Sequence, residues 1–115
     1  MKMPRMAGDA LNLFEILPAP GAGEEFRDLA NRDGVRIERI VSRGDVTPEG
    51  FWYDQAWHEW VLVVEGEAEL ALEAPNEVIT LRRGDSFLIE AHRRHRVTRT
   101  GDPTIWLAVH WPAAN

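Results

Sequence analysis

The stretches Glu59-Trp-Val-Leu-Val-Val-Glu-Gly66 and Gly84-Asp-Ser-Phe-Leu-Ile-Glu-Ala-His-Arg-Arg-His95 decide how this chain can fold. The first is an acidic residue that opens an apolar run and ends at a glycine turn. The second begins at a glycine turn, continues through an apolar run and reaches a histidine. Short apolar runs between turn residues are typical of buried strands. The two stretches therefore predict strands that carry a carboxylate and an imidazole near their ends.

In their spacing these stretches resemble the paired motifs of the cupin family, H-x-H-x(3,4)-E-x(6)-G and G-D-x(4)-P-x-G-x-x-H. Glu59 and His95 stand at the glutamate and the last histidine, while Tyr53 and Gln55 stand where the first two histidines would be. The resemblance covers roughly residues 35–111. It implies an all-β fold, an antiparallel double-stranded β-helix or jelly-roll barrel. It also implies a divalent metal ion in the lumen, nickel, zinc, iron or manganese.

Composition limits the classes of partner. The 115 residues suffice for one domain. The formal net charge of −6 argues against nucleic acid and anionic membranes, because like charges repel at long range. The absence of cysteine excludes disulfides and thiolate ligands. We find neither an apolar run of membrane-spanning length nor a signal peptide, so we expect a cytoplasmic protein.

The pattern along the chain predicts a lead of residues 1–34 that packs on a barrel domain of residues 35–115. Within the lead, short helical pieces are expected over 9–17 and 23–31. From residue 35 onward apolar and polar residues alternate, as in half-buried antiparallel strands. The alternation predicts that Val35, Ile37, Ala68, Leu70 and Leu72 point inward and that Arg36, Glu38, Glu67, Glu69 and Glu73 point outward. Further strands are expected over 51–55, 59–65, 77–81, 86–90, 95–99 and 104–111.

Glu59 and His95 are the main candidates for chemistry. A carboxylate that opens an apolar run is costly to bury unless it is paired, bound to metal or protonated. His95 shares a strand face with Val97, which is consistent with a pocket residue. The alternatives are a strand-end glutamate that reaches solvent and a core histidine bonded to a backbone carbonyl. We expect both side chains to face the lumen.

The rest of the predicted metal site is weaker. Gln55 offers a neutral amide oxygen and Tyr53 a protonated phenol, so the two should hold a transition metal less well than imidazoles. His110 could turn into the lumen from the closing strand or lie at the surface. His58 and Asp54 are suitable ligand types, but alternation places them on the opposite face unless a turn resets it. His92 is predicted to lie at the rim.

Two functions are therefore predicted. In the first, Gln55, Glu59, His95 and His110 hold a divalent metal, with Tyr53, Glu59 and His95 as catalytic residues. In the second, a metal-free pocket binds or isomerises a small molecule, with Glu59 and His95 as acid and base. Either pocket is expected to prefer a carboxylate, bound by Arg94 or Arg96 at the mouth.

Two surface features carry further expectations. The arginines at positions 93, 94, 96 and 99 could instead form a solvated strand face that pairs with the acidic residues Glu67, Glu69 and Glu73 across the sheet. The five tryptophans exceed what one small core needs, so some should lie at a pocket mouth or a subunit contact. Together with the resemblance to small cupins, they predict a homodimer.

Overall fold

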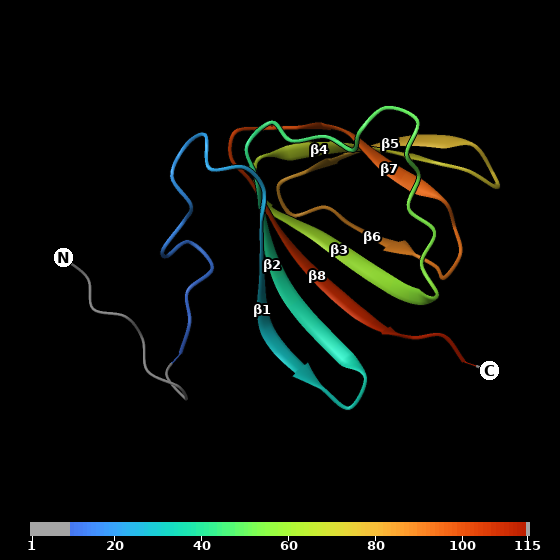
Figure 1. Cartoon of the computed structure of the whole chain (residues 1–115), viewed down its shortest axis with the longest axis horizontal. Helices are drawn as coiled ribbons and strands as arrows, with labels where there is room; N and C mark the ends of the chain where they lie inside the picture. Colours follow the sequence, from blue (N-terminus) through green and yellow to red (C-terminus); the bar gives the residue numbers. More distant parts are fainter. Residues whose placement is uncertain (1–9, 115) are drawn as a thin grey trace.

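The computed structural model describes residues 10–114, in which eight strands form two antiparallel sheets (Figure 1). The larger sheet has the order β1-β2-β8-β3-β6, and the smaller has the order β5-β4-β7. The strands are β1 (Glu25–Arg32), β2 (Val35–Ser42), β3 (Trp57–Glu65), β4 (Glu67–Leu72), β5 (Glu77–Arg82), β6 (Ser86–Ile89), β7 (His95–Thr100) and β8 (Thr104–Pro112). Within the described residues no helix is long and apolar enough to span a membrane.

The two sheets face one another across an apolar core, which confirms the predicted all-β barrel (Figure 1). In β4 the side chains of Ala68, Leu70 and Leu72 are at most 2% exposed, as the alternation predicted. Val61 and Val63 of β3 meet them from the larger sheet. Burial of these side chains supplies most of the free energy that holds the sheets together.

The helix predicted over 23–31 is wrong, because Glu25–Arg32 form the strand β1. This strand pairs with β2 from Glu25 opposite Val41 to Arg32 opposite Val35, with a shift of register between Asp28 and Ala30. The connecting Asp33-Gly34 has positive φ at both residues, the geometry of a tight hairpin turn. This dipeptide is a hairpin signal that outweighs the weak helical pattern before it. The larger sheet thus begins before residue 35, where the sequence predicted the barrel domain to start.

Two other expected elements are absent from the described part of the chain. Residues 10–17 form turns and bends instead of a helix, and residue 9 lies outside the described residues. The strand predicted over 51–55 is wrong, because only Tyr53 makes a bridge, to His95. Its backbone exchanges two hydrogen bonds with His95, of 2.8 and 3.1 Å. The segment meets β7 at this one point.

At the start of β2, the inner and outer faces are the reverse of those predicted. Arg36 and Glu38 line the lumen, although the alternation was interpreted as placing them outside. Arg39, on the other face, is as buried as Glu38, with 2% and 7% exposed. Because both faces of β2 are covered, alternation alone could not identify the inner one.

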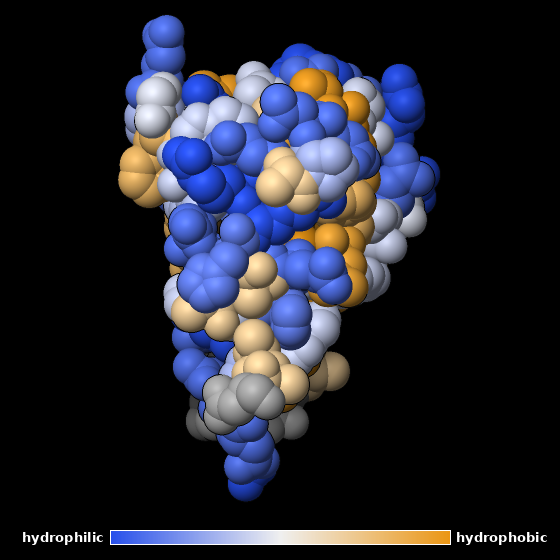
Figure 2. All heavy atoms as spheres, turned by 90° about the vertical axis from the view of Figure 1, so that its right-hand side faces the viewer, coloured by the Kyte–Doolittle hydropathy of each residue, from blue (hydrophilic) through white to orange (hydrophobic). Residues whose placement is uncertain are grey.

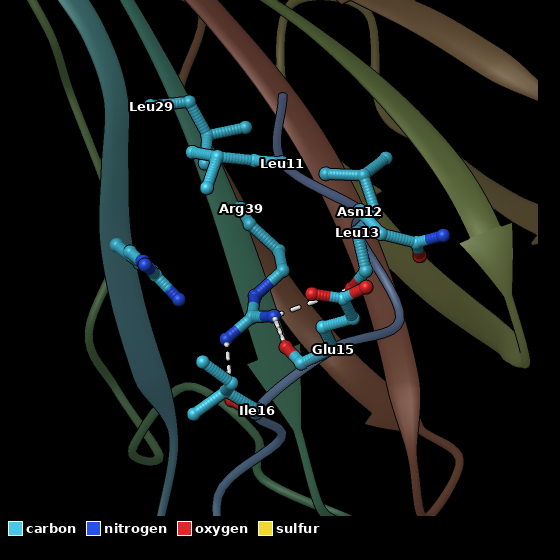
Figure 3. Close-up of a pocket in the computed structure, with 8 residues that line it drawn as sticks. Leu11, Asn12, Leu13, Glu15, Ile16, Leu29 and Arg39 are labelled. Atoms are coloured by element: carbon cyan, nitrogen blue, oxygen red, sulfur yellow. Dashed lines mark hydrogen bonds between the residues drawn. The ribbon is translucent and has the colours of Figure 1, made fainter. Parts of the chain in front are cut away.

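Arg39 attaches the lead to the outer face of β2 (Figure 3). Its guanidinium donates to the carbonyl oxygens of Leu13, Glu15 and Ile16 at 3.2, 2.7 and 3.2 Å. It also forms an ion pair with Glu25 of β1. One buried cation thus satisfies several backbone carbonyls that form no regular structure.

Candidate functional site in the barrel lumen

The sheet register brings polar residues from distant parts of the sequence into one transverse row. Arg36 of β2 lies opposite His110 of β8, which lies opposite Glu59 of β3, which lies opposite Ile89 of β6. Directly paired residues share a face of the sheet, so these side chains point into the same space. Farther along the barrel the corresponding rows are mostly apolar. The lumen therefore has one polar end.

These side chains line a cavity of about 420 Å³, within the range of small-molecule pockets. Its lining combines carboxylates and histidines with apolar and aromatic side chains: Glu24, Phe26, Arg36, Glu38, Ile40, Tyr53, Gln55, Glu59, Val61, Leu70, Ile89, His95, Val97, Trp106 and His110. All five residues predicted for the site, Tyr53, Gln55, Glu59, His95 and His110, are among them.

His110 is held by hydrogen bonds at both ring nitrogens. The indole Nε1–H of Trp57 donates to its Nδ1 at 2.9 Å. Because an indole can only donate, Nδ1 carries no proton, and the proton lies on Nε2. That proton points to Glu38 Oε1 at 2.9 Å, with Glu59 Oε2 at 3.7 Å. His110 is thus a neutral donor toward two carboxylates, with no free lone pair.

His95 has the opposite arrangement. Its Nδ1 lies 2.9 Å from the carbonyl oxygen of Arg93, which can only accept, so Nδ1 carries the proton. Its Nε2 lone pair faces the lumen, 3.9 Å from Glu59 Oε1. Burial lowers the pKa of this imidazole, and the bond to Arg93 and the charge of Asp54 oppose the shift only in part. The ring of Tyr53 stacks on it with centroids 5.5 Å apart.

Glu59 stands between the two histidines and is only 7% exposed. Burial raises the pKa of its carboxyl above the usual value. The negative charge of Glu38 acts in the same direction, whereas His110 and Arg36 oppose it. Burial likewise raises the pKa of the Tyr53 phenol, which therefore remains a hydrogen-bond donor. The site holds a carboxyl that binds its proton unusually well beside an imidazole that binds its proton unusually poorly.

The predicted metal ligands can be tested against this geometry. The Nε2 of His95, the carboxylate of Glu59 and the Oε1 of Gln55, which is buried without a hydrogen-bond partner, are available. Both nitrogens of His110 are engaged. Within residues 10–114, no group of three or more His, Cys, Asp or Glu side chains is arranged to hold a metal ion. One imidazole, one carboxylate and one amide oxygen form a weak donor set for a transition metal.

Three other polar candidates lie outside the cavity. His58 accepts a hydrogen bond from the backbone amide of Ala91 at 3.0 Å. Asp54 pairs with the exposed His92 at 2.8 Å. His58 lies on the face of β3 that alternation assigned to it, and the pair of Asp54 and His92 lies at the surface.

The arginines expected at the mouth are engaged elsewhere. Arg94 pairs with Glu73 at 2.8 Å, and Arg96 donates to the carbonyl of Thr47 at 3.2 Å. Neither lines the cavity. Arg99 pairs with Glu67, so the alternative interpretation, a basic face answering an acidic strand, describes this region. Figure 2 shows a side of the molecule where hydrophilic residues predominate and hydrophobic atoms appear in smaller areas.

From the sequence, Arg36 and Glu38 were not assigned to the lumen, and Trp57 was not singled out among the five tryptophans. The first two were assigned to the wrong face of their strand. The position of Trp57 did indicate its direction, because Trp57 and Glu59 are two residues apart on one strand and therefore point to the same face. The partner that makes it relevant, His110, is 53 residues away and adjacent only in the folded sheet.

The fold and this lumen define a small barrel with a polar interior end, and comparison with known proteins identifies its family. The cupin domain matches residues 38–110, so the chain belongs to the cupin family. None of the curated proteins compared with it matches.

Several solved structures are similar. A candidate mannose-6-phosphate isomerase from Ralstonia eutropha JMP134 is 44% identical, with 91% of this chain and 99% of that chain covered and a TM-score of 0.86. A cupin superfamily protein from Desulfitobacterium hafniense DCB-2 is 19% identical, with 96% and 95% covered and a TM-score of 0.76. KdgF from Halomonas sp. is 21% identical, with 81% and 83% covered and a TM-score of 0.67. The last two support the fold alone.

Proposed function

We propose that this cupin binds a small polar molecule in its lumen and moves a proton on it through Glu59 and His95. One observation carries the proposal: a carboxyl whose pKa is raised by burial and an imidazole whose pKa is lowered by burial face each other at 3.9 Å in one cavity. Opposite shifts bring their proton affinities together, so either group can take a proton and return it.

The reaction class that suits this pair is isomerisation next to a carbonyl group. Ionised Glu59 takes a proton from the carbon beside the carbonyl, and the electron pair of the broken C–H bond forms an enediolate. The Tyr53 hydroxyl donates a hydrogen bond to the carbonyl oxygen. Glu59 returns its proton to the neighbouring carbon, while His95 Nε2 carries the hydroxyl proton from one oxygen to the other. The reaction needs no external oxidant or reductant.

The 44% identical protein is described as a candidate isomerase of a sugar phosphate, which agrees with this reaction class. We therefore propose a hydroxylated carbonyl compound as the substrate. A carboxylate group on the ligand, expected from the sequence, stays part of the proposal, although the arginine that would bind it must differ from Arg94 and Arg96.

Hydrogen exchange into a panel of candidate substrates tests the proposal. Aldoses, hexose phosphates and uronic acids are incubated with the protein in D₂O, and loss of the C–H signal beside the carbonyl is followed by proton NMR. Glu59→Gln should reduce exchange by about 100-fold or more. Glu90→Gln removes an exposed carboxylate outside the cavity and should leave the rate unchanged. The proposal fails if the wild type exchanges none of these compounds, or if Glu59→Gln exchanges as fast.

A divalent metal is a second candidate function, and the buried, unpaired Gln55 Oε1 is the observation that favours it. Together with His95 Nε2 and Glu59 it could hold an ion, which when bound would act as a Lewis acid on a ligand oxygen. His110 would join only after releasing Glu38. Nickel, zinc, iron and manganese are the candidates.

Metal titration of the apo protein separates the two candidates. A metal that binds only the folded form raises its melting temperature by mass action. His95→Ala should abolish this rise, and His92→Ala, which removes an exposed histidine outside the cavity, should keep it. No rise at about millimolar metal in the wild type would eliminate the metal site.

We also propose that the protein forms a homodimer and resides in the cytoplasm. Exposed apolar side chains on the lead and on β1 support a subunit contact there: Leu11, Phe14, Ile16 and Phe26 are each at least 50% exposed. Fractionation of the native cells would test the location.

A further inference from the structure

Arg36 is a lumen residue to which the proposed reaction gives no role. It projects from β2 into the cavity, in the same row as His110 and Glu59. Its side chain is only partly exposed, and its Nε is fully shielded from solvent. A guanidinium in this position faces whatever occupies the polar end of the lumen.

The guanidinium of Arg36 has no hydrogen bond or ion pair to any residue within 10–114, and its buried Nε has no acceptor. The buried Nε atoms of Arg39, Arg43 and Arg96 also have no acceptor, but the terminal nitrogens of these arginines form hydrogen bonds, whereas those of Arg36 form none with the described residues. Arg39 bonds three carbonyls and a glutamate, and Arg43 bonds Asp102 and the carbonyl of Pro18. Arg36 acts on Glu59 only through the longer-range attraction of their charges, so its unbonded donors can bind an anionic partner from outside the chain.

The carboxylates of the lumen do not provide that partner. Glu38 accepts from His110 at 2.9 Å, and Glu24 accepts from Ser42 at 2.6 Å. Within residues 10–114, neither Glu38 nor Glu59 forms an ion pair with Arg36, and both lie beside His110 instead. The positive charge of Arg36 is therefore available to a ligand.

Gln55 supplies a second unpaired group in the same cavity. Its buried Oε1 can accept a hydrogen bond but has no donor in the described chain. A ligand that satisfies both residues must carry an oxyanion for Arg36 and a hydroxyl or amide hydrogen for Gln55. Guanidinium groups bind carboxylates and phosphates through paired hydrogen bonds. The cavity of about 420 Å³ suits a compact molecule of this kind.

We infer that Arg36 binds the anionic group of the lumen ligand, a carboxylate or phosphate on a small hydroxylated molecule. The inference rests on the proposed function, because it takes the lumen as a small-molecule site. The anion-binding role that the sequence suggested for Arg94 or Arg96 is thus assigned to Arg36, a residue inside the cavity. Arg36 thereby determines which ligands are accepted and does not itself carry the transferred proton.

The test measures binding of three related probes by calorimetry: gluconate, glucose 6-phosphate and neutral glucitol. The wild type should bind at least one anionic probe about tenfold or more tightly than glucitol. Arg36→Gln should lose that preference, with a drop of about tenfold in affinity for the anion and little change for glucitol. Arg36→Lys should recover part of it, and Arg94→Gln should bind like the wild type. The stronger anionic probe identifies carboxylate or phosphate.

Other outcomes overturn the inference. Anion binding that is equal in Arg36→Gln and the wild type would do so, as would a wild type that binds glucitol as well as the anions or binds no anion at about 10 mM. The melting temperature of Arg36→Gln serves as the control for folding, and it should stay close to that of the wild type because Arg36 forms no hydrogen bond or ion pair within residues 10–114. Glu59→Gln should still bind the anion but no longer exchange protons, so failure of this inference and failure of the proposed reaction are distinguishable.

Discussion

At the scale of single residues, burial sets the proton chemistry of the lumen. Glu59 and His95 are 7% and 5% exposed, and desolvation is the largest cause of the pKa shift of each. Desolvation disfavours the charged form, so it acts in opposite directions on an acid and a base. The two groups do not form a hydrogen bond with each other, because His95 Nε2 and Glu59 Oε1 are 3.9 Å apart. Both are therefore free to exchange protons with a ligand.

The raised pKa of Glu59 predicts a pH-dependent stability. Above the usual value of 4.5, the unfolded chain releases this proton before the folded protein does. The free energy of unfolding therefore decreases as pH rises from 4.5 through the folded pKa, because the folded state must bury a carboxylate. Glu59→Gln should remove this loss and melt at a higher temperature than the wild type at pH 8, but not at pH 4.

Thermal melting from pH 4 to pH 8 would check this prediction. Glu90→Gln, at an exposed position, should follow the wild-type profile. A Glu59→Gln protein that melts lower than the wild type at every pH would mean that the carboxylate stabilises the fold instead.

At the scale of elements, the lead and the β3–β4 turn each depend on one residue. Arg39 joins an irregular segment to β2 with hydrogen bonds to three carbonyls. Gly66, between β3 and β4, has a φ of +85° and lies against the backbone of Pro103 and Thr104. In both places the contact is between segments far apart in the sequence.

Arg39→Ala should detach the lead while the barrel stays folded. The change leaves the carbonyls of Leu13, Glu15 and Ile16 without their donor, and hydrogen bonds to charged groups are worth roughly 1.5–3 kcal/mol. We expect a loss of about 3 kcal/mol in the free energy of unfolding and faster amide exchange over residues 11–24. Arg27→Ala, on the neighbouring strand, should change neither. Unchanged exchange in the Arg39 variant would contradict this assignment.

Gly66→Ala should be markedly destabilising. A Cβ there would lie 2.5 Å from the carbonyl oxygen of Pro103, and the positive φ adds strain of about 1–2 kcal/mol. Gly44→Ala is a matched control, since its φ is +77° and nothing lies within 4 Å. Denaturant unfolding should show a further loss of about 1–3 kcal/mol at Gly66 over Gly44. Equal losses would show that the turn can move.

At the scale of the whole molecule, the larger sheet extends beyond the smaller one and leaves β1 at an edge (Figure 1). Phe26 of this strand is 58% exposed, and Phe14 and Ile16 of the lead are similarly exposed. Exposed apolar edges are places where chains associate.

The proposed homodimer is predicted to bury this edge. Light scattering at tens of micromolar should give twice the chain mass of 13.1 kDa. Phe26→Lys should shift the mass toward the monomer, since a buried unpaired charge opposes association. Leu88→Lys, at an exposed position on the opposite edge strand, should not. A wild-type protein that is monomeric at this concentration would refute the dimer.

Much of the fold and part of the candidate site could be predicted from the sequence. Alternation in residues 67–72 and glycine turns such as Gly66 indicated an antiparallel barrel, because these signals are local and depend on backbone geometry. The spacing of Glu59 and His95 placed both residues at the lumen. That expectation rested on the spacing from Glu59 to Gly66 and on the match of His95 to the second motif, both of which can be read in the sequence.

Only the tertiary structure decided which face of β2 is inner, that β1 is a strand, and which partners His110 has. Alternation separates two faces of a strand but does not say which one is buried when both are covered. The tautomer of His110 depends on Trp57 and Glu38, which are 53 and 72 residues away in sequence. Such contacts arise from pairing between distant strands, and that pairing is set by the packing of the whole barrel rather than by any local pattern.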